Sequence, residues 1–420
     1  MKIAILGTTL QAGVLAALLA EYGNQVYWCY QHSHLSTTSI NIQYQDEEVN
    51  RRLSKQREAK MLLQSTLVDL PLDIDTYLFC YNPAEFKLAL NTLQELALRP
   101  IIHPKLMVNG STFGLHGTDK LKAILPNDDW VYFPDVIQEG NAINSVLNVK
   151  HVIIGAEAEA AKLMMEELLR PFFRYQNQYL FMPILDAEFT KLSISGMLAT
   201  RISYMNDLAD VAEKLGIDIA HVRDGMAADS RIGESYLYSG AGFGGENFSH
   251  DILTLSHTIS NTGTKSQLLG QVWDINEQQK EFLFRKLWNY YHGNLAGKTI
   301  AIWGAAFKQH TSSTSFSPIH PMLAALWAQG VTVRLHDPQA LEEIHTIYGE
   351  RDNLILCEDQ YDAVNQAHGL CVLTAWKQYW SLDYTQLKLK LAHPLILDGR
   401  NIYQPDYVKS QGFAYMGVGR

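Results

Sequence analysis

The sequence predicts an α/β protein with two doubly wound α/β domains joined by long helices. Short apolar strands alternate with helical patterns at both ends of the chain, which is the order of βαβ units. The middle of the chain shows the 3.6-residue apolar period of long helices instead. The chain has 420 residues, which is more than one hydrophobic core normally serves.

The N-terminal α/β domain is expected at residues 1–186. It opens with the strand "KIAIL" at residues 2–6, a Gly/Thr turn, a helix that ends at Gly23, and the strand "QVYWCY". Further strands are expected at residues 74–81 and in "KLMVNG" and "VYFPD". Residues 31–66 are polar and helical in propensity, and no strand is predicted there.

The central helical domain is expected at residues 187–292. One long helix ends at Gly216, and a second is predicted over residues 266–291. The first helix carries an apolar stripe that one connector helix cannot cover, so the sequence predicts a homodimer formed through the central helices. The stripe consists of Leu198, Ile202, Met205, Leu208 and Val211.

The C-terminal α/β domain is expected at residues 293–420. The strand pattern restarts in "KTIAIWGAAF", a helix follows and ends at Gly330, and "VTVRLHDP", "GLCVLTAW" and "HPLILDGRNIY" are later strands. Ligands of such domains bind at the carboxyl ends of the parallel strands. Two domains of this kind predict two ligand sites.

The composition excludes several function classes. A net charge of −10 and a pI near 5.8 disfavour nucleic-acid and anionic-membrane partners. No apolar run reaches the roughly 18 residues of a membrane span. Four scattered cysteines predict reduced, buried thiols in a cytoplasmic protein. His250, Asp251 and His257 lack a fourth ligand, so no metal site is predicted.

Several motifs, in their order and spacing, resemble those of the UDP-glucose/GDP-mannose dehydrogenase family. They are "GSTFGLHGT", "FPDVIQEGNA", "AEFTKLSISGMLATRISYMNDLADVAEKLG", "DSRIGESYLYSGAGFGGENFSHD", "GAAFKQHT", "LTAW", "LDGRN" and "GFAYMGVGR". The resemblance covers nearly the whole chain. It implies two Rossmann-like domains and the NAD-dependent oxidation of the C6 alcohol of a nucleotide sugar to a carboxylate. In that family a cysteine captures the aldehyde and holds a thioester that water cleaves.

The resemblance places Asn247 where the family motif GFGGSCFPKD has its cysteine. A carboxamide cannot form a thiohemiacetal, so the residue needed for the second oxidation is missing. Asp251 matches the water-activating aspartate, Lys191 the lysine that stabilises the oxyanion, and Ser195 replaces an asparagine. Thr112 and Asp135 match polar residues around the reacting carbon.

Purely structural roles also explain some of these matches. Lys191 and Asp251 are also explained as a buried ion pair. Asp135 and Glu139 are also explained as N-cap and first-turn acids of a helix.

The cofactor motif differs from the family's GxGxxG. Gly7 is kept, Thr9 replaces the second glycine and Ala12 the third. Tyr30 stands where the family has the acidic residue that accepts from the adenosine ribose. Thr112 is also on the family's cofactor side. NAD is the cofactor that the resemblance implies, but the changes together predict that ordinary NAD binding is lost.

The resemblance also implies a nucleotide-sugar ligand, most simply a UDP-sugar. Two basic family positions are lost, at Ser315 and Tyr238, and Arg400 is alternatively explained as a surface charge. Arg231 matches an arginine that reaches across the family's dimer. The positions that match substrate contacts are Glu139, Arg231, Phe243, Gly244, Lys308 and Arg400.

Three functions remain open from the sequence. The leading hypothesis is a non-catalytic or regulatory family member that binds a nucleotide sugar in polysaccharide or glycoconjugate metabolism. The second is an NAD(P)-dependent oxidoreductase that performs one two-electron step, because the first hydride transfer needs no thiol. The third is a complete four-electron dehydrogenase with another nucleophile. An enzyme of either kind needs a dinucleotide at Gly7–Ala12, and a binding protein does not.

Overall fold

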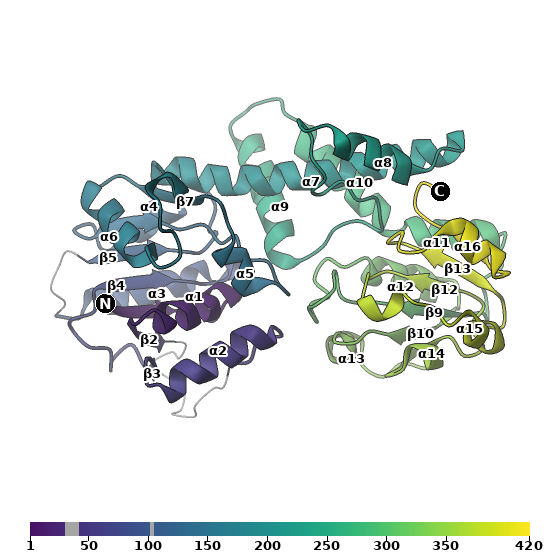
Figure 1. The fold of residues 1–420 in the computed structure, drawn as a ribbon, viewed down its shortest axis with the longest axis horizontal. Helices are drawn as coiled ribbons and strands as arrows, with labels where there is room; N and C mark the ends of the chain where they lie inside the picture. The colour runs from purple at the N-terminus through teal and green to yellow at the C-terminus, as the bar shows by residue number, and fades with distance from the viewer. Residues whose placement is uncertain (30–41, 101–104) are drawn as a thin grey trace. The chain divides into compact units, whose positions relative to one another are not determined.

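The computed structural model describes residues 1–29, 42–100 and 105–420. The chain divides into two compact units, Met1–Ile194 and Ser195–Arg420, and Figure 1 labels the elements of both. Each unit contains a fully or largely parallel sheet covered by helices, so the predicted α/β fold class is confirmed. The three domain boundaries given above stay predictions.

The first unit is built on an eight-stranded sheet with the order β3-β2-β1-β4-β5-β6-β7-β8. All neighbouring strands are parallel except β6 and β7, which are antiparallel. The order reverses between β1 and β4, which is where α/β sheets of this type bind ligands. The strands are β1 (Lys2–Leu6), β2 (Gln25–Cys29), β3 (Leu62–Ser65), β4 (Thr76–Phe79), β5 (Leu106–Asn109), β6 (Asp129–Tyr132), β7 (Val152–Ala156) and β8 (Tyr179–Met182).

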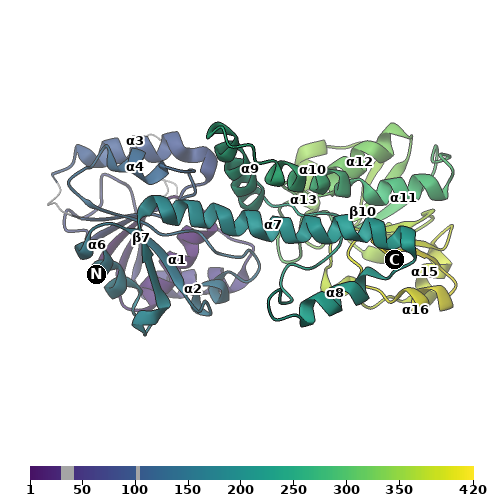
Figure 2. The ribbon, with the colours of Figure 1, turned by 90° about the horizontal axis from the view of Figure 1, so that it is seen from above.

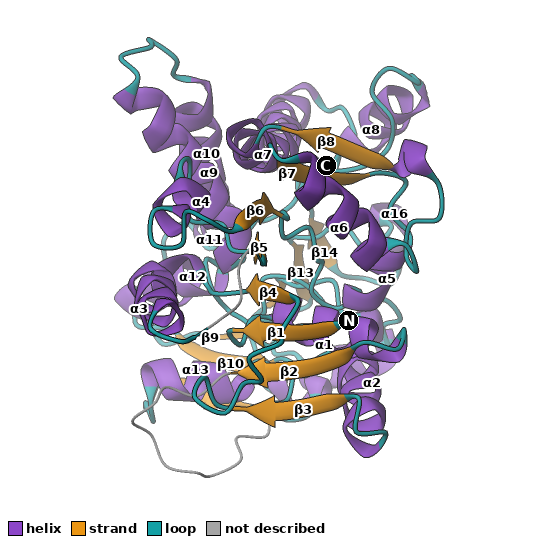
Figure 3. Ribbon diagram, turned by 90° about the vertical axis from the view of Figure 1, so that its left-hand side faces the viewer, coloured by secondary structure: helices purple, strands orange, loops and turns teal. Residues whose placement is uncertain are grey.

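Helices cover both faces of this sheet, as Figure 3 shows. Strand β1 sends Ile3 and Ile5 into the core under α1, α2, α5 and α6, and Ala4 and Leu6 into the core under α3 and α4. A strand buried on both faces reads as a continuous apolar run, which is why "KIAIL" was recognisable. The helices are α1 (Leu10–Glu21), α2 (Glu47–Glu58), α3 (Phe86–Ala97), α4 (Gly117–Lys122), α5 (Ala142–Leu147) and α6 (Glu159–Leu169), with 3₁₀ turns at Pro83–Glu85 and Gln176–Gln178.

Strand β3 was missed by the sequence analysis, which expected no strand in residues 31–66. Its four residues "LLQS" pair with β2, and only Leu62 is buried. A short, half-exposed edge strand has too few apolar residues to produce a periodic signal.

The central helices agree with prediction in one case and differ in the other. Helix α7 (Ile184–Leu215) is unbroken, as Figure 2 shows. The predicted second helix is two helices, α10 (Leu268–Lys280) and α11 (Phe282–Tyr290), separated at Glu281. Val272 of α10 packs in a small cluster with Phe243, whereas Leu287 of α11 packs in the C-terminal core. Because α10 and α11 pack against different cores, they take different directions, and the chain breaks between them. Helices α8 (Ile219–Ala228) and α9 (Glu246–Asn261) complete this region.

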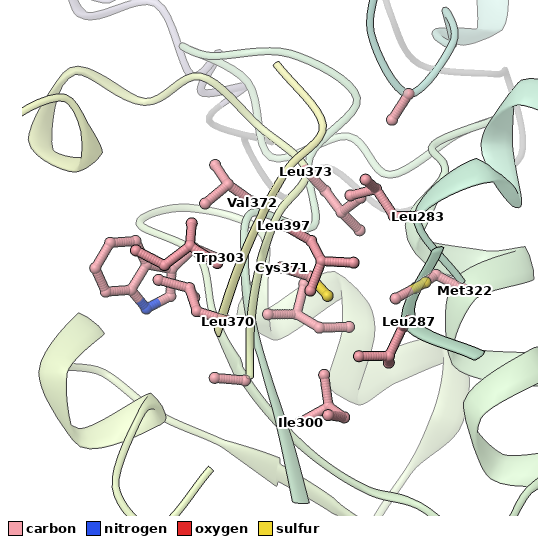
Figure 4. Packing of buried hydrophobic residues seen from close by; sticks show 14 of the residues in the cluster. Leu283, Leu287, Ile300, Trp303, Met322, Leu370, Cys371, Val372, Leu373 and Leu397 are labelled. Atoms are coloured by element: carbon pink, nitrogen blue, oxygen red, sulfur yellow. The ribbon is translucent and has the colours of Figure 1, made fainter. Parts of the chain in front are cut away.

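The second unit ends in a six-stranded, fully parallel sheet with the order β11-β10-β9-β12-β13-β14. Figure 4 shows its core, with Trp303 on one side of the strands and Leu287 and Met322 on the other. The elements are β9 (Thr299–Trp303), α12 (Ile319–Ala328), β10 (Thr332–His336), α13 (Leu341–Tyr348), β11 (Leu354–Leu356), α14 (Gln360–Ala363), β12 (Leu370–Val372), a 3₁₀ turn (Lys377–Tyr379), α15 (Tyr384–Lys390), β13 (Leu395–Asp398), α16 (Pro405–Ser410) and β14 (Ala414–Met416).

The apolar stripe predicted on α7 faces largely inward. Met205 is fully buried, and Ile202 and Leu208 pack against apolar clusters of the second unit. The prediction that one chain leaves these three residues uncovered was therefore wrong, because the C-terminal core and the α9–α10 region cover them. Within the second unit, the exposed apolar face of α7 consists of Met197, Tyr204, Val211 and Leu215.

No helix among the described residues has the length and apolarity of a membrane span.

Candidate functional site

The glycine-rich stretch Gly240–Gly245 is fixed by polar side chains of two helices. Asn276 of α10 accepts from the Phe243 amide at 2.7 Å and donates to its carbonyl at 3.1 Å. Asn206 of α7 accepts from the Gly240 amide at 2.8 Å, and Gln279 donates to the Gly240 carbonyl at 2.9 Å. Because these groups are buried, the loop has a single well-determined path.

Asn247 lies in the first turn of α9, directly after this loop, and its side chain is exposed. The helix begins after Gly245, whose φ of +95° favours glycine. The position is therefore accessible and lies at the positive end of a helix dipole, the environment that activates a cysteine thiolate. The carboxamide that occupies it has no ionisable proton to release.

Two other predicted catalytic residues of the second unit meet in its interior. Ser195 of α7 donates a hydrogen bond from Oγ to Oδ2 of Asp251 on α9 at 2.7 Å. Both side chains are buried. The serine that replaces the family's asparagine thus still holds this carboxyl group in place through a hydrogen bond.

The four cysteines of the chain are poorly placed to act as a nucleophile. All four are free and buried, and they lie in or just after strands β2, β4, β11 and β12. Burial raises the pKa of Cys29 and Cys371 to about 12, and it also raises the pKa of Cys80 and Cys357. A buried, protonated thiol is neither a nucleophile nor accessible to a sugar.

Arg400 is a clamp on three backbone segments rather than a surface charge. Its guanidinium donates from Nε to the Leu373 carbonyl at 2.5 Å, from Nη1 to the Gly242 carbonyl at 3.2 Å, and from Nη2 to the Phe307 carbonyl at 3.3 Å. Burial lowers the pKa of Arg400 to about 10, although Asp398 opposes this shift. The surface-charge alternative is therefore wrong.

The glycine loop passes tightly between two aromatic residues. A Cβ on Gly244 would lie 2.6 Å from the Phe316 carbonyl oxygen, and a Cβ on Gly245 would lie 2.9 Å from the Phe307 ring. Lys308, just after β9, has its ammonium 5.5 Å from the Phe307 ring centroid. The structure thus brings Phe243, Gly244, Lys308 and Arg400 to one loop at the carboxyl end of the second sheet.

Lys280 was missed by the sequence analysis. Its side chain is 3% exposed, and its ammonium is 2.6 Å from Glu277 and 5.6 Å from the ring centroids of both Trp273 and Phe316. A lysine in the polar run "NEQQK" gives no sign of burial in the sequence. It adds a cation beside Gly242, since a Cβ on that glycine would lie 3.4 Å from its Cγ.

Arg231 is placed differently. It is 88% exposed on a turn after α8 and pairs with Asp229 at 2.6 Å.

In the first unit, Asp135 and Glu139 are not the capping residues of a helix. The next helix, α5, begins at Ala142 after Asn141. Asp135 accepts from the Ile137 amide at 3.0 Å, and the buried Oε2 of Glu139 has no hydrogen-bond partner among the described residues. The capping alternative is therefore wrong, and a buried carboxylate oxygen without a donor is what a ligand hydroxyl would satisfy. Thr112 follows β5, and Lys191 lies on α7.

The turn after β1 differs from the glycine-rich turn at which a dinucleotide's pyrophosphate usually binds. Gly7 has φ +111°, and a Cβ there would lie 2.1 Å from the Cys80 carbonyl oxygen, so this glycine is obligatory. Thr9 caps α1 by accepting from the Ala12 amide at 3.3 Å. A pyrophosphate needs a bare backbone at this position and helix N–H groups that are free. Tyr30 lies outside the described residues.

Both sheets contain the order 3-2-1-4-5-6 with a glycine turn after the first strand, which defines a protein with two Rossmann-type nucleotide-binding folds. The central-domain model of the UDP-glucose/GDP-mannose dehydrogenase family matches residues 185–278. The UDP binding domain model of the same family matches residues 301–405. The chain belongs to the UDP-glucose/GDP-mannose dehydrogenase family.

Individual relatives agree with this assignment. The chain is 37% identical to UDP-glucose 6-dehydrogenase of Pseudomonas aeruginosa over 290 residues, which cover 68% of this chain and 64% of that protein. It is 32% identical to UDP-glucose 6-dehydrogenase TuaD of Bacillus subtilis over 324 residues, 75% of this chain and 69% of that protein. The matches thus span about two thirds of these relatives.

A solved structure shows the same fold over the whole chain. The UDP-glucose dehydrogenase of Pyrobaculum islandicum superimposes with a TM-score of 0.84 at 22% identity, covering 100% of this chain and 97% of that one.

The cysteines allow a direct test of their burial. None of the four thiols should react with Ellman's reagent in the native protein at pH 8, and all four should react in guanidinium chloride. Burial raises the pKa of all four thiols, to about 12 for Cys29 and Cys371, so the folded chain holds these protons at a pH where the unfolded chain releases them, from about pH 8.5. The free energy of unfolding should therefore fall as the pH rises above about 9. A thiol that reacts in the native state would contradict this picture.

Proposed function

We propose that this chain is a nucleotide-sugar-binding member of the UDP-glucose/GDP-mannose dehydrogenase family that does not perform the four-electron oxidation. The observation that carries the proposal is Asn247, an exposed carboxamide at the family's nucleophile position. Oxidation of an enzyme-bound aldehyde through a thioester requires a carbon–sulfur bond. The four buried thiols do not supply that sulfur.

The binding half of the proposal rests on the second unit. The match to the UDP binding domain model covers residues 301–405, which include Lys308, Arg400 and most of the second sheet. Its glycine loop is held by Asn276, Gln279 and Arg400, so the loop is pre-formed before any ligand arrives. We place a UDP-sugar at the carboxyl end of this sheet, with Lys308 as a contact for phosphate. The four cysteines form no disulfide, which supports a location in the reducing cytoplasm.

A second candidate is an oxidoreductase that performs a single two-electron step. The hydrogen bond between Ser195 and Asp251 favours it, because a supported carboxylate remains available for proton transfer. It requires a dinucleotide, and the Thr9 cap opposes that requirement.

The purified protein should produce no NADH from NAD and UDP-glucose. NADH formation is measured by its absorbance. Asn247→Cys should remain inactive, because the dinucleotide turn is also altered. The matched control is Asn261→Cys, which places an exposed thiol at the other end of α9. Both new thiols should react with Ellman's reagent, which shows that they are accessible. Two equivalents of NADH per sugar with a carboxylate product would overturn the proposal, and one equivalent would establish the second candidate.

UDP should raise the melting temperature of the protein. A ligand that binds only the folded state stabilises it by about 2.7 kcal/mol at 100 times its Kd. Lys308→Gln removes one charged hydrogen bond, worth roughly 1.5–3 kcal/mol, and should weaken the Kd about tenfold or more. Lys298→Gln is the control, because Lys298 precedes β9 and lies over Tyr291. A UDP-induced rise in melting temperature that is the same in both variants would refute a UDP site at Lys308. The absence of any such rise in the wild type would refute it too.

We also propose that the chain forms a homodimer through the exposed face of α7. Light scattering at micromolar concentration should give twice the mass of 47.4 kDa. Tyr204→Glu places a charge in this face and should shift the mass toward the monomer, since an unpaired charge at an apolar interface is costly. Leu389→Glu, at an 80% exposed position on α15, is the control and should leave the mass unchanged. A wild-type monomer would contradict the proposal.

A further inference from the structure

The carboxyl end of the first sheet is bridged by side chains of the protein itself. The strand order reverses between β1 and β4, and the crevice at such a reversal is where a dinucleotide lies across the strand ends. Two side chains from the start of α1 cross this edge in the described part of the first unit.

Thr9 crosses the reversal point itself. Its hydroxyl donates to the Cys80 carbonyl, one residue after β4, at 3.1 Å. The same oxygen accepts from the Ala12 amide at the start of α1 at 3.3 Å. The side chain therefore connects the turn after β1 to the end of β4 and takes a helix N–H group that a pyrophosphate would use.

Gln11 covers the next two strand ends. Its side chain is 2% exposed, and its Nε2 lies 3.5 Å from the Phe133 carbonyl, just after β6. Its Oε1 lies 2.6 Å from where a Cβ of Gly110, just after β5, would be. The amide thus fills the space that the bare Gly110 leaves open, and Thr9 and Gln11 together span the ends of β4, β5 and β6.

The turn is also held from its carbonyl side by two stacked aromatic residues. The Trp28 indole donates to the Gly7 carbonyl at 2.9 Å, and the Tyr44 hydroxyl donates to the Thr9 carbonyl at 2.9 Å and the Thr8 carbonyl at 3.1 Å. Their ring centroids are 6.4 Å apart, with an interplanar angle of 10°. The turn therefore does not move aside for a ligand without breaking the buried hydrogen bond from Trp28 and the shared hydrogen bond from Tyr44.

We propose that Thr9 and Gln11 are specificity-determining residues that exclude dinucleotides from the first unit by filling the crevice with side chains. The inference deepens the account of why oxidation is lost, but it stands apart from the proposed function. It concerns the first unit alone, whereas the proposed function rests on Asn247 and the second unit, and only the expected inactivity of Asn247→Cys depends on both. A failure of one therefore leaves the other to be judged by its own experiment.

The test is NADH binding to the full chain, measured by isothermal titration calorimetry. The double variant Thr9→Gly/Gln11→Ala empties the crevice and should bind NADH at least about tenfold more tightly than the wild type, a gain of about 1.4 kcal/mol. Thr8→Gly is the matched control, because Thr8 is exposed in the same turn and contributes only its carbonyl to Tyr44. It should bind no better than the wild type. Circular dichroism verifies that each variant is folded.

The other outcomes are decisive as well. A folded double variant that binds NADH no more tightly than the wild type would overturn the proposal. A gain in Thr8→Gly equal to that of the double variant would show general loosening of the turn, which also overturns it. If the double variant does not fold, Thr9→Ala alone must show a gain for the proposal to stand.

Discussion

The close approach of the Gly240–Gly245 backbone to its surroundings is the constraint on which the second unit depends. Side chains would not fit at Gly244 or Gly245, where the Phe316 carbonyl and the Phe307 ring lie within 3 Å of a Cβ position. The carbonyls and amides of this loop are in turn the anchors for Asn276, Gln279 and Arg400. One stretch of backbone thereby fixes the start of α9, the position of α10 and the loops after β9 and β13.

This arrangement separates the residues that shape the site from those that perform chemistry. The shaping residues persist and are buried and hydrogen-bonded. The chemical position, Asn247, is exposed and makes no demand on the fold. A carboxamide at this position therefore leaves the loop intact, and the fold itself does not require a thiol there. The first unit differs, because there the altered residue Thr9 has become part of the structure as a helix cap.

The sequence predicted most of the fold because buried parallel strands and long amphipathic helices leave strong patterns. It did not predict the edge strand β3, whose residues are half polar, or the break at Glu281, where two amphipathic helices adjoin without a glycine or proline. Which face of α7 is covered depends on tertiary contacts of Met205 that no local pattern contains. For the candidate site, motif spacing singled out Asn247, Asp251 and Arg400 as candidate residues. The burial of Lys280 and the bridging by Gln11 depend on residues far away in the sequence.

The clamp formed by Arg400 has a consequence for how evolution acts on this position. Its guanidinium binds the carbonyls of Leu373, Gly242 and Phe307, which belong to three distant segments. Selection for folding alone would then retain an arginine here, even in a lineage that no longer binds a sugar. An invariant arginine at this position across relatives would therefore be weak evidence that they bind a ligand. Substitution of Lys308 among relatives would be more informative, because this side chain is proposed to contact the phosphate.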